Sequence, residues 1–316
     1  MKALAYDRFG GLDVLHFAEL EEPRVGPGLV LVSLRASSVN VIDNRVRAGK
    51  MGLLAGKRFP RIPGADVAGV VVETGTSVAG LKVGDSVFGA LDPFKGGAFA
   101  ERAAMPANQL ALKPPELAFE TAAALPLAGL AALTSIRDLG KVGRRVKVLI
   151  HGASGAVGLF AVQIARRLGA EVTAVAGTAG IEAAKAAGAD IVVDYRKQDA
   201  SHFPVSFDVI LNASGALPYA QAKASLAGGG RFIEPSPTIP GVIGATILNV
   251  FRHRQHLPLM TKVRRADLEL LATWAMEGSL KPLIAKNYPF ADAPEALRAM
   301  EQGGVVGKVV VSMGGA

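Results

Sequence analysis

The hydrophobic pattern of the chain changes near residue 113. Before this point, short apolar runs at 29–39, 65–75 and 85–91 are separated by Gly and Pro clusters and show little helical spacing. Runs of this kind are typical of β-strands. After Lys113-Pro114-Pro115 the sequence becomes rich in Ala and helical in pattern. The pattern therefore predicts a β-rich domain over the first third and a second domain that starts near residue 120.

The second domain alternates strands with helices. Apolar runs separated by Ala-rich helical segments predict an α/β domain with a parallel sheet that is buried on both faces. From about Thr261 a further helix is expected, and the run at 305–313 predicts a closing strand. The five strands predicted for the sheet lie at 146–150, 171–175, 190–194, 207–211 and 231–235.

Composition removes several kinds of chemistry. The 316-residue chain has no cysteine, which excludes disulfides, thiolate nucleophiles, iron–sulfur clusters and cysteine-bound zinc. No signal peptide is expected at the start, and the longest uncharged stretches, 121–136 and 235–251, are too short for a membrane helix. We therefore expect a cytoplasmic protein with no membrane partner.

The net charge of +8 is compatible with an anionic partner. Basic residues are spread thinly apart from the stretch Arg252–Arg265, which lacks interleaved aromatic residues. We expect no nucleic-acid partner, because an anionic cofactor explains the charge more simply.

A glycine loop carries the strongest signal. The segment HGASGAVG follows the apolar run 146–150 and precedes a helical pattern that ends at Gly169. Three glycines at intervals of three allow a tight turn, close approach of a pyrophosphate, and packing of helix on strand. The alternative is a tight turn without a ligand. The loop residues expected to bind a dinucleotide are Gly152, Ala153, Ser154, Gly155, Ala156 and Val157.

The end of the second strand predicts which dinucleotide is bound. An NAD site usually has a carboxylate there, but this chain has Ala176-Gly177-Thr178, so the sequence favours NADP by absence of a repelling charge. The expected contacts are Gly177, Thr178, Tyr195 and Arg196; for Tyr195 and Arg196 the alternative is a solvated turn. Asn212 ends the fourth strand, where ligands of such sheets lie, and its alternative is a turn-forming Asn.

Motifs in order along the whole chain resemble the zinc-free medium-chain dehydrogenase/reductases of the quinone oxidoreductase type. These motifs are NVIDNRVRAG, PRIPGADVAGVVVETG, VGDSVFGA, ALPLAGLAAL, HGASGAVG and GVVGKVVV. The resemblance implies a GroES-like catalytic domain from both chain ends (1–121 and 261–316) and a Rossmann domain (122–260), with the active site between them. It also implies a homodimer.

The resemblance further implies which groups are present and which are missing. Zinc-dependent relatives have Cys near Ser38 and Gly-His-Glu after Pro63, whereas this chain has Gly64-Ala65-Asp66, so no zinc is expected. The residues placed near the reaction are Asn40, as donor or positioner, and Asp43. Lys308 is placed near the cofactor. The alternatives are a turn-holding Asn for Asn40 and a solvated charge at a strand edge for Lys308.

The expected function follows from the missing metal. Without a Lewis acid to stabilise an alkoxide, reduction of quinones or α,β-unsaturated carbonyls by NADPH is favoured over alcohol oxidation. Two alternatives stay open: an enoyl-thioester reductase, with the basic stretch Arg252–Arg265 meeting coenzyme A phosphates, and a non-catalytic NADPH-binding sensor or structural protein.

Overall fold

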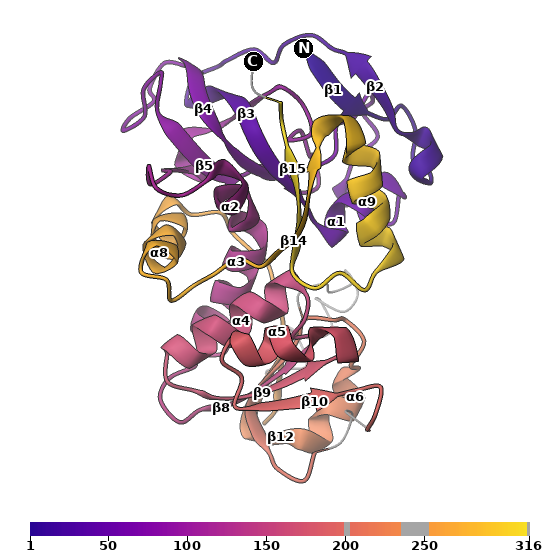
Figure 1. Cartoon of the computed structure of the whole chain (residues 1–316), viewed down its shortest axis with the longest axis vertical. Helices are drawn as coiled ribbons and strands as arrows, with labels where there is room; N and C mark the ends of the chain where they lie inside the picture. The colour runs from indigo at the N-terminus through magenta and orange to yellow at the C-terminus, as the bar shows by residue number, and fades with distance from the viewer. Residues whose placement is uncertain (199–202, 235–252, 315–316) are drawn as a thin grey trace. The chain divides into compact units, whose positions relative to one another are not determined.

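The computed structural model describes residues 1–198, 203–234 and 253–314 and divides into two compact units (Figure 1). Unit 1 comprises Met1–Leu127, Val263–Glu277 and Ile284–Ala316; unit 2 comprises Ala128–Lys262 and Gly278–Leu283. The sequence placed the domain boundaries after residues 121 and 260. In the structure the first segment of unit 1 ends at residue 127, and the first segment of unit 2 ends at residue 262. The sequence did not set apart the short segment at 278–283. Arg252, and Pro235 at the end of a predicted strand, lie outside the described residues.

Unit 1 is built on a seven-stranded sheet in which the order is β14-β15-β3-β4-β5-β7, with β6 paired to β3. Its apolar side chains pack into one core that contains residues from both ends of the chain. Leu4, Val67 and Val311 all belong to this core. The strands are β3 (Leu29–Val39), β4 (Asp66–Thr74), β5 (Ser86–Ala90), β6 (Arg102–Pro106), β7 (Leu110–Leu112), β14 (Ile284–Pro289) and β15 (Lys308–Ser312), beside the separate pair β1 (Lys2–Ala5) and β2 (His16–Glu19).

Helices cover parts of this sheet. The helix α2 contacts β3 and β4, and α9 contacts β15 and α1 (Figure 1). The closing strand β15 pairs antiparallel with β3, so that Val309 lies opposite Val39. This pairing brings the last strand of the chain to the end of β3. The helices of unit 1 are α1 (Val41–Arg47), α2 (Phe119–Ala124), α8 (Arg265–Met276) and α9 (Ala293–Gln302), while α3 (Pro126–Leu133) and the π-helical turn Thr134–Leu139 follow at the boundary with unit 2.

Unit 2 contains a six-stranded parallel sheet in the order β10-β9-β8-β11-β12-β13. The α/β fold class predicted from the sequence is confirmed. Because the strand order reverses between β8 and β11, this is the point at which ligands of doubly wound sheets lie. The strands are β8 (Lys147–His151), β9 (Glu171–Ala176), β10 (Ile191–Asp194), β11 (Phe207–Asn212), β12 (Leu226–Glu234) and β13 (Gln255–Pro258).

The helices of unit 2 pack on this sheet through Ala-rich faces. The helix α4 (Ala156–Arg167) contacts β8 and β9, and α5 (Ile181–Ala186) contacts β9 and β10; α6 (Tyr219–Ala222) contacts β12. Small side chains allow α4 to approach the strands closely, as the complete burial of Ala161 and Ala165 shows. No helix in the described ranges combines the length and the apolar character that crossing a bilayer requires.

Candidate functional site

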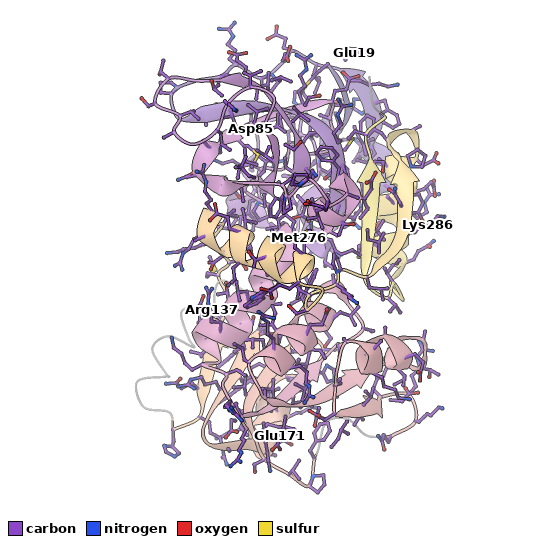
Figure 2. All side chains as sticks on the ribbon, turned by 60° about the vertical axis from the view of Figure 1, so that its left-hand side comes forward. Glu19, Asp85, Arg137, Glu171, Met276 and Lys286 are labelled. Carbon is purple, nitrogen blue, oxygen red and sulfur yellow. The ribbon has the colours of Figure 1, made fainter. Side chains whose placement is uncertain are left out.

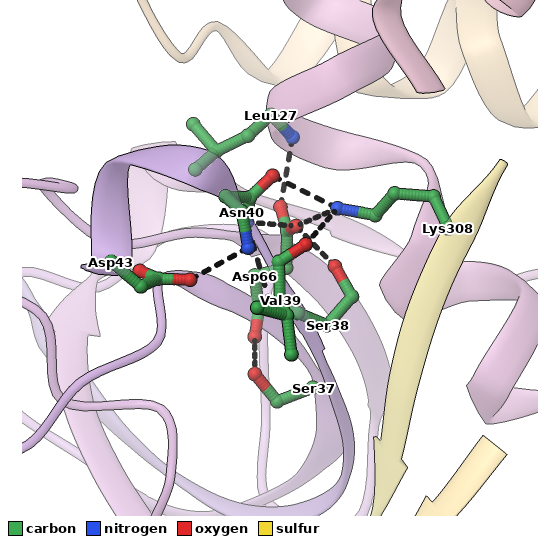
Figure 3. A network of polar contacts seen from close by, with 8 residues as sticks. All are labelled: Ser37, Ser38, Val39, Asn40, Asp43, Asp66, Leu127 and Lys308. Carbon is green, nitrogen blue, oxygen red and sulfur yellow. Dashed lines mark hydrogen bonds and ion pairs between the residues drawn. The ribbon is translucent and has the colours of Figure 1, made fainter. Parts of the chain in front are cut away.

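A buried polar network lies in unit 1 where three strands meet. Ser37 and Ser38 stand near the end of β3, Asp66 is the first residue of β4, and Lys308 is the first residue of β15. The antiparallel pairing of β15 with β3 places the start of β15 beside the end of β3. Figure 3 shows Lys308 reaching from its strand towards Asn40 and Asp66. Residues that are distant in sequence therefore share one polar cluster.

Asp66 is the centre of this network. Its side chain is fully buried, and Oδ2 accepts hydrogen bonds from the Ser38 hydroxyl, from Nδ2 of Asn40 at 2.8 Å and from Nζ of Lys308 at 3.1 Å. Its other oxygen, Oδ1, accepts from the backbone N–H of Leu127 at 2.8 Å. A buried carboxylate needs such partners because desolvation otherwise penalises its charge. Lys308 supplies the compensating positive charge.

Lys308 is itself only 1% exposed. Its ammonium donates to Oδ1 of Asn40 at 2.9 Å and to the carbonyl of Val39 at 3.2 Å, in addition to Asp66. The alternative that the sequence left open, a solvated charge at a strand edge, is therefore wrong. Because its three N–H donors have these partners, Lys308 acts on the network itself; its contact with a cofactor stays a prediction.

The network fixes the orientation of Asn40. Oδ1 of Asn40 faces the Lys308 ammonium, while Nδ2 faces the Asp66 carboxylate, so that exchanging the two amide atoms would replace attractions by repulsions. The second hydrogen of Nδ2 has only a long contact of 3.4 Å with the carbonyl of Ser38. Asn40 is also partly exposed, whereas Ser38, Asp66 and Lys308 are buried. It is thus the member of this set with a donor that a ligand can reach.

Asp43 supports Asn40 from the first turn of α1. Its Oδ2 accepts the backbone N–H of Asn40 at 2.7 Å, and Asn40 is the N-cap residue of this helix. Burial raises the pKa of Asp43 from 3.8 to about 7; the nearby Asp66 carboxylate also raises it, and Lys308 lowers it. The alternative reading of Asn40, an asparagine that holds a turn, applies to its backbone N–H, which binds Asp43. Its side chain instead binds Asp66 and Lys308 in the buried network.

The pH dependence of stability should report on Asp43. Between pH 4 and 7 the folded protein keeps a proton that the unfolded chain has released, so the free energy of unfolding should fall as pH rises through this window. Relative to Asp43→Asn, wild type should lose about 2–3 kcal/mol between pH 5 and 8. Urea unfolding of both proteins at several pH values measures this difference. Parallel curves for the two proteins would contradict it.

The glycine loop of unit 2 gives each glycine a different environment. Gly152 has a φ of +88°, and a Cβ there would lie 2.6 Å from the backbone nitrogen of Ser214. A Cβ on Gly158 would lie 2.3 Å from the carbonyl oxygen of Gly152, because α4 packs closely on the loop. Both glycines are therefore required by the fold itself. The turn and the helix packing expected for this loop are both present.

Gly155 has no such internal requirement. Its φ of −75° suits any residue, and a Cβ there would only come within 3.7 Å of the Gly152 carbonyl oxygen, an ordinary contact. Gly155 is also the N-cap residue of α4, and no described side chain caps this helix end. The first-turn N–H groups are thus left for water or an anion. This open cradle of backbone donors fits the phosphates of a dinucleotide; their binding here stays a prediction.

A hydrogen-bonded chain joins the ends of β8 and β11. Nδ1 of His151 lies 2.6 Å from the Ser214 hydroxyl, which donates to Oδ1 of Asn212 at 3.0 Å. With the serine hydrogen used in this way, Nδ1 carries the hydrogen and Nε2 is an acceptor. Burial lowers the pKa of His151, which favours this neutral form. The sequence did not predict this contact between His151 and Ser214, because the two residues lie 63 positions apart in the chain.

Asn212 uses its side chain within its own loop. Its Nδ2 donates to the carbonyl of Leu217 at 2.8 Å, and its Oδ1 accepts from the backbone N–H of Leu217 and from Ser214. This is the turn-forming role that the sequence offered as the alternative. A direct contact between Asn212 and a cofactor stays a prediction.

The ends of β9 and β10 bring together the remaining predicted contacts. A Cβ on Gly177 would lie 3.1 Å from the Tyr195 hydroxyl, so the tyrosine ring rests against this glycine. Thr178 and Arg196 are exposed at the same edge. In the parallel register Asp194 is paired with Ala176, and Glu171 stands at the opposite end of β9 (Figure 2). Gly177, Thr178, Tyr195 and Arg196 therefore surround one sheet edge.

This edge also holds a carboxylate that the sequence analysis overlooked. Oδ2 of Asp194 accepts the hydroxyl hydrogen of Thr178 at 2.7 Å, and Oδ1 accepts the backbone N–H of Arg196 at 3.0 Å. The inference that no carboxylate lies near the end of the second strand is wrong. The residues that end that strand carry no carboxylate, but Asp194 ends the neighbouring strand β10.

The basic stretch at 252–265 is divided by the two units. Arg254, in unit 2, donates to the carbonyl of Leu226, and Arg265, in unit 1, donates to the carbonyls of Ala107 and Leu110. These described arginines are held by backbone carbonyls of their own units. No group of three or more His, Asp or Glu side chains within the described part of the chain is arranged to hold a metal ion.

Comparison with known proteins connects both units to one family. Residues 26–115 match the alcohol dehydrogenase GroES-like domain, and residues 187–311 match the zinc-binding dehydrogenase family. The chloroplast envelope quinone oxidoreductase homolog of Arabidopsis thaliana is 30% identical over 322 residues, covering 98% of each chain. The chain belongs to the quinone oxidoreductase type of the medium-chain dehydrogenases/reductases. The resemblance noted in the sequence is thereby confirmed, and this family member is an oxidoreductase.

Two further likenesses cover nearly the whole of this family member. The NADPH-dependent alkenal/one oxidoreductase of Arabidopsis thaliana is 32% identical over 323 residues, which are 98% of this chain and 79% of the relative. The structure of Escherichia coli quinone oxidoreductase complexed with NADPH matches with a TM-score of 0.86 and 26% identity, covering 99% of this chain and 100% of that one. A nicotinamide cofactor and a small-molecule substrate follow for this family member.

Proposed function

We propose that this oxidoreductase reduces quinones or α,β-unsaturated carbonyl compounds with NADPH and without a metal. The observation that carries the proposal is the buried Lys308–Asp66 pair with Asn40 on its accessible side. Zinc-dependent members of the family have Cys and Gly-His-Glu at the positions that Ser38 and Gly64-Ala65-Asp66 occupy here. In this chain the positive charge beside Asp66 is the ammonium of Lys308.

The roles of the chain's own residues follow from their contacts. NADPH, when bound, supplies the hydride for the substrate. In unit 2 the N–H groups at the start of α4 and the glycines of the loop would hold its phosphates. In unit 1 the second hydrogen of Asn40 Nδ2, which makes only a 3.4 Å contact with the Ser38 carbonyl, would donate to the substrate oxygen as negative charge develops there. The Lys308–Asp66 pair keeps this amide in one orientation, and a proton from solvent completes the reduction.

NADPH is proposed as the preferred hydride donor because cationic side chains lie at the ends of β9 and β10, where the adenosine ribose of such cofactors is expected. These cations would attract the 2′-phosphate that NADH lacks. Arg196 and Lys197 are exposed directly after β10, and Tyr195 rests beside Gly177. Two relatives carry NADPH in their names. The enoyl-thioester alternative has no comparable support, since Arg254 and Arg265 are engaged by backbone carbonyls. A homodimer in the cytoplasm completes the proposal, and gel filtration tests the dimer.

A substrate panel tests the reaction class. NADPH oxidation should proceed with 1,4-benzoquinone or a short enal, whereas NADP-dependent oxidation of ethanol or benzyl alcohol should be near background. Asn40→Ala should lower kcat/KM about tenfold, the effect of roughly 1.4 kcal/mol of transition-state stabilisation. Asn108→Ala removes an exposed asparagine of the same unit and serves as the control.

The opposite pattern would show that the reaction class is wrong. Robust alcohol oxidation without any quinone or enone reduction, or stoichiometric zinc that chelation removes together with activity, would each overturn the proposal. Selective turnover of an enoyl-CoA would favour the thioester alternative instead. Elemental analysis of the purified protein accompanies the assays.

A further inference from the structure

The contact between Thr178 and Asp194 limits what Thr178 can recognise. A threonine hydroxyl has one hydrogen to donate and two lone pairs that accept. Thr178 gives this hydrogen to Oδ2 of Asp194 at 2.7 Å. It therefore faces a ligand as an acceptor. A ribose 2′-hydroxyl can donate to such a group, whereas a 2′-phosphate has only acceptor oxygens near pH 7 and cannot.

Asp194 adds a negative charge at the same position. Asp194 is 9% exposed, and each of its carboxylate oxygens accepts a hydrogen bond, one from Thr178 and the other from the N–H of Arg196. The hydrogen bond from Thr178 lowers the pKa of Asp194, with further lowering by the Arg196 N–H and by the charges of Lys197 and Arg196. The carboxylate is consequently ionised near neutral pH and stands next to the end of β9.

The residues around this carboxylate exert opposing forces on the 2′-phosphate that distinguishes NADPH from NADH. Arg196 and Lys197 are exposed and would attract a 2′-phosphate, while Asp194 and the lone pairs of Thr178 would repel it. The cations are exposed on the turn after β10. The carboxylate is held in place by two hydrogen bonds, so its repulsion of a 2′-phosphate acts from a fixed position.

We propose that Asp194, held by Thr178, is a specificity-determining residue that restricts the preference for NADPH and lets NADH bind at the same site. This inference rests on the proposed function, because it presumes that the adenosine ribose of a dinucleotide lies at the end of β9. It also reverses the role that the sequence predicted for Thr178. Thr178 is the residue that orients Asp194, and it is not a donor to the phosphate.

Binding without turnover tests this inference. Titration calorimetry with NADPH and NADH, and with the fragments 2′,5′-ADP and 5′-ADP, gives the affinity ratio in the absence of any substrate. Asp194→Asn removes the charge and keeps an oxygen that accepts from Thr178. It should raise the NADPH/NADH affinity ratio about tenfold, as expected for removal of one like charge a few ångströms from the 2′-phosphate. The gain should shrink at 0.5 M salt, because salt ions screen the repulsion between this carboxylate and the phosphate.

Asp190→Asn is the matched control. Asp190 precedes β10 at its other end, where it accepts from Arg166 and from the N–H of Val172, and its replacement changes the net charge by the same amount. It should leave the ratio within about twofold. A similar increase in both variants would mean that only overall charge matters, and no change in Asp194→Asn would likewise overturn the inference.

A second variant keeps the test informative if Asp194→Asn is poorly folded. Thr178→Val removes the hydroxyl and leaves the carboxylate in place. If Thr178 donated to a 2′-phosphate, this change would lower the NADPH/NADH ratio severalfold. Under our inference the ratio does not fall and rises instead, because the change removes an acceptor that a ribose hydroxyl can donate to and that repels a phosphate. Wild-type protein that binds neither dinucleotide would instead contradict the proposed function, so the two failures are distinguishable.

Discussion

Valine in place of Gly155 should weaken NADPH binding at least about a hundredfold, or roughly 2.7 kcal/mol, while the free protein stays folded. The reason is that a Cβ at this position makes only an ordinary 3.7 Å contact with the Gly152 carbonyl oxygen, whereas the side chain would occupy the place where phosphates approach the N-terminus of α4. Fluorescence titration with NADPH measures the affinity, and thermal unfolding without cofactor measures the stability. We expect a small change in Tm.

Gly158→Ala is the matched control for this loop. Its Cβ would lie 2.3 Å from the Gly152 carbonyl oxygen, so even this one added carbon should destabilise the free protein. The two variants thus separate a glycine needed by a ligand from a glycine needed by the fold. If Gly155→Val bound NADPH within about threefold of wild type, the loop would not be the phosphate site.

Lys308→Met should destabilise the protein by about 3–5 kcal/mol, because it leaves the Asp66 carboxylate buried without its counter-charge. Asp66→Asn should also be destabilising, since it leaves the ammonium of Lys308 in the same buried place. The double variant should lose clearly less than the sum of the two single losses. Urea unfolding of the four proteins supplies the complete cycle.

Simple additivity in this cycle would contradict the role given to the pair. A second readout distinguishes positioning from stability. At temperatures where the variants stay folded, Lys308→Met should lower kcat more than it raises KM for a quinone, because Asn40 loses the group that fixes its carbonyl oxygen. Lys308→Arg keeps the charge and should recover part of the lost stability.

The sequence predicted the parallel sheet of unit 2 well, because strands buried on both faces are continuous apolar runs. The first strand was placed at 146–150 and is found at Lys147–His151. The edge strand β13 was missed. Its sequence, Gln255–Pro258, is polar and only half buried, so no apolar pattern indicates it.

The sites were predictable to the extent that their residues are close in sequence. The glycine loop depends on local spacing alone. The partnership of Asp66 with Lys308 spans 242 residues and arises from the pairing of β15 with β3, which no local pattern shows. Asp194 was within reach of sequence reasoning, because neighbouring parallel strands end side by side and the third strand ends in a carboxylate.

The position of β15 has a consequence for the order in which the protein forms during synthesis. This strand lies between β14 and β3 in the sheet of unit 1, yet residues 308–312 leave the ribosome after the whole of unit 2 has been made. Domains generally fold as units while the chain emerges. The nucleotide-binding half therefore has its complete sequence first, and until β15 arrives the nascent chain carries Asp66 without Lys308. We expect ribosome-bound chains that have exposed residue 283 but not yet residue 308 to protect unit 2 from proteases and to leave unit 1 open.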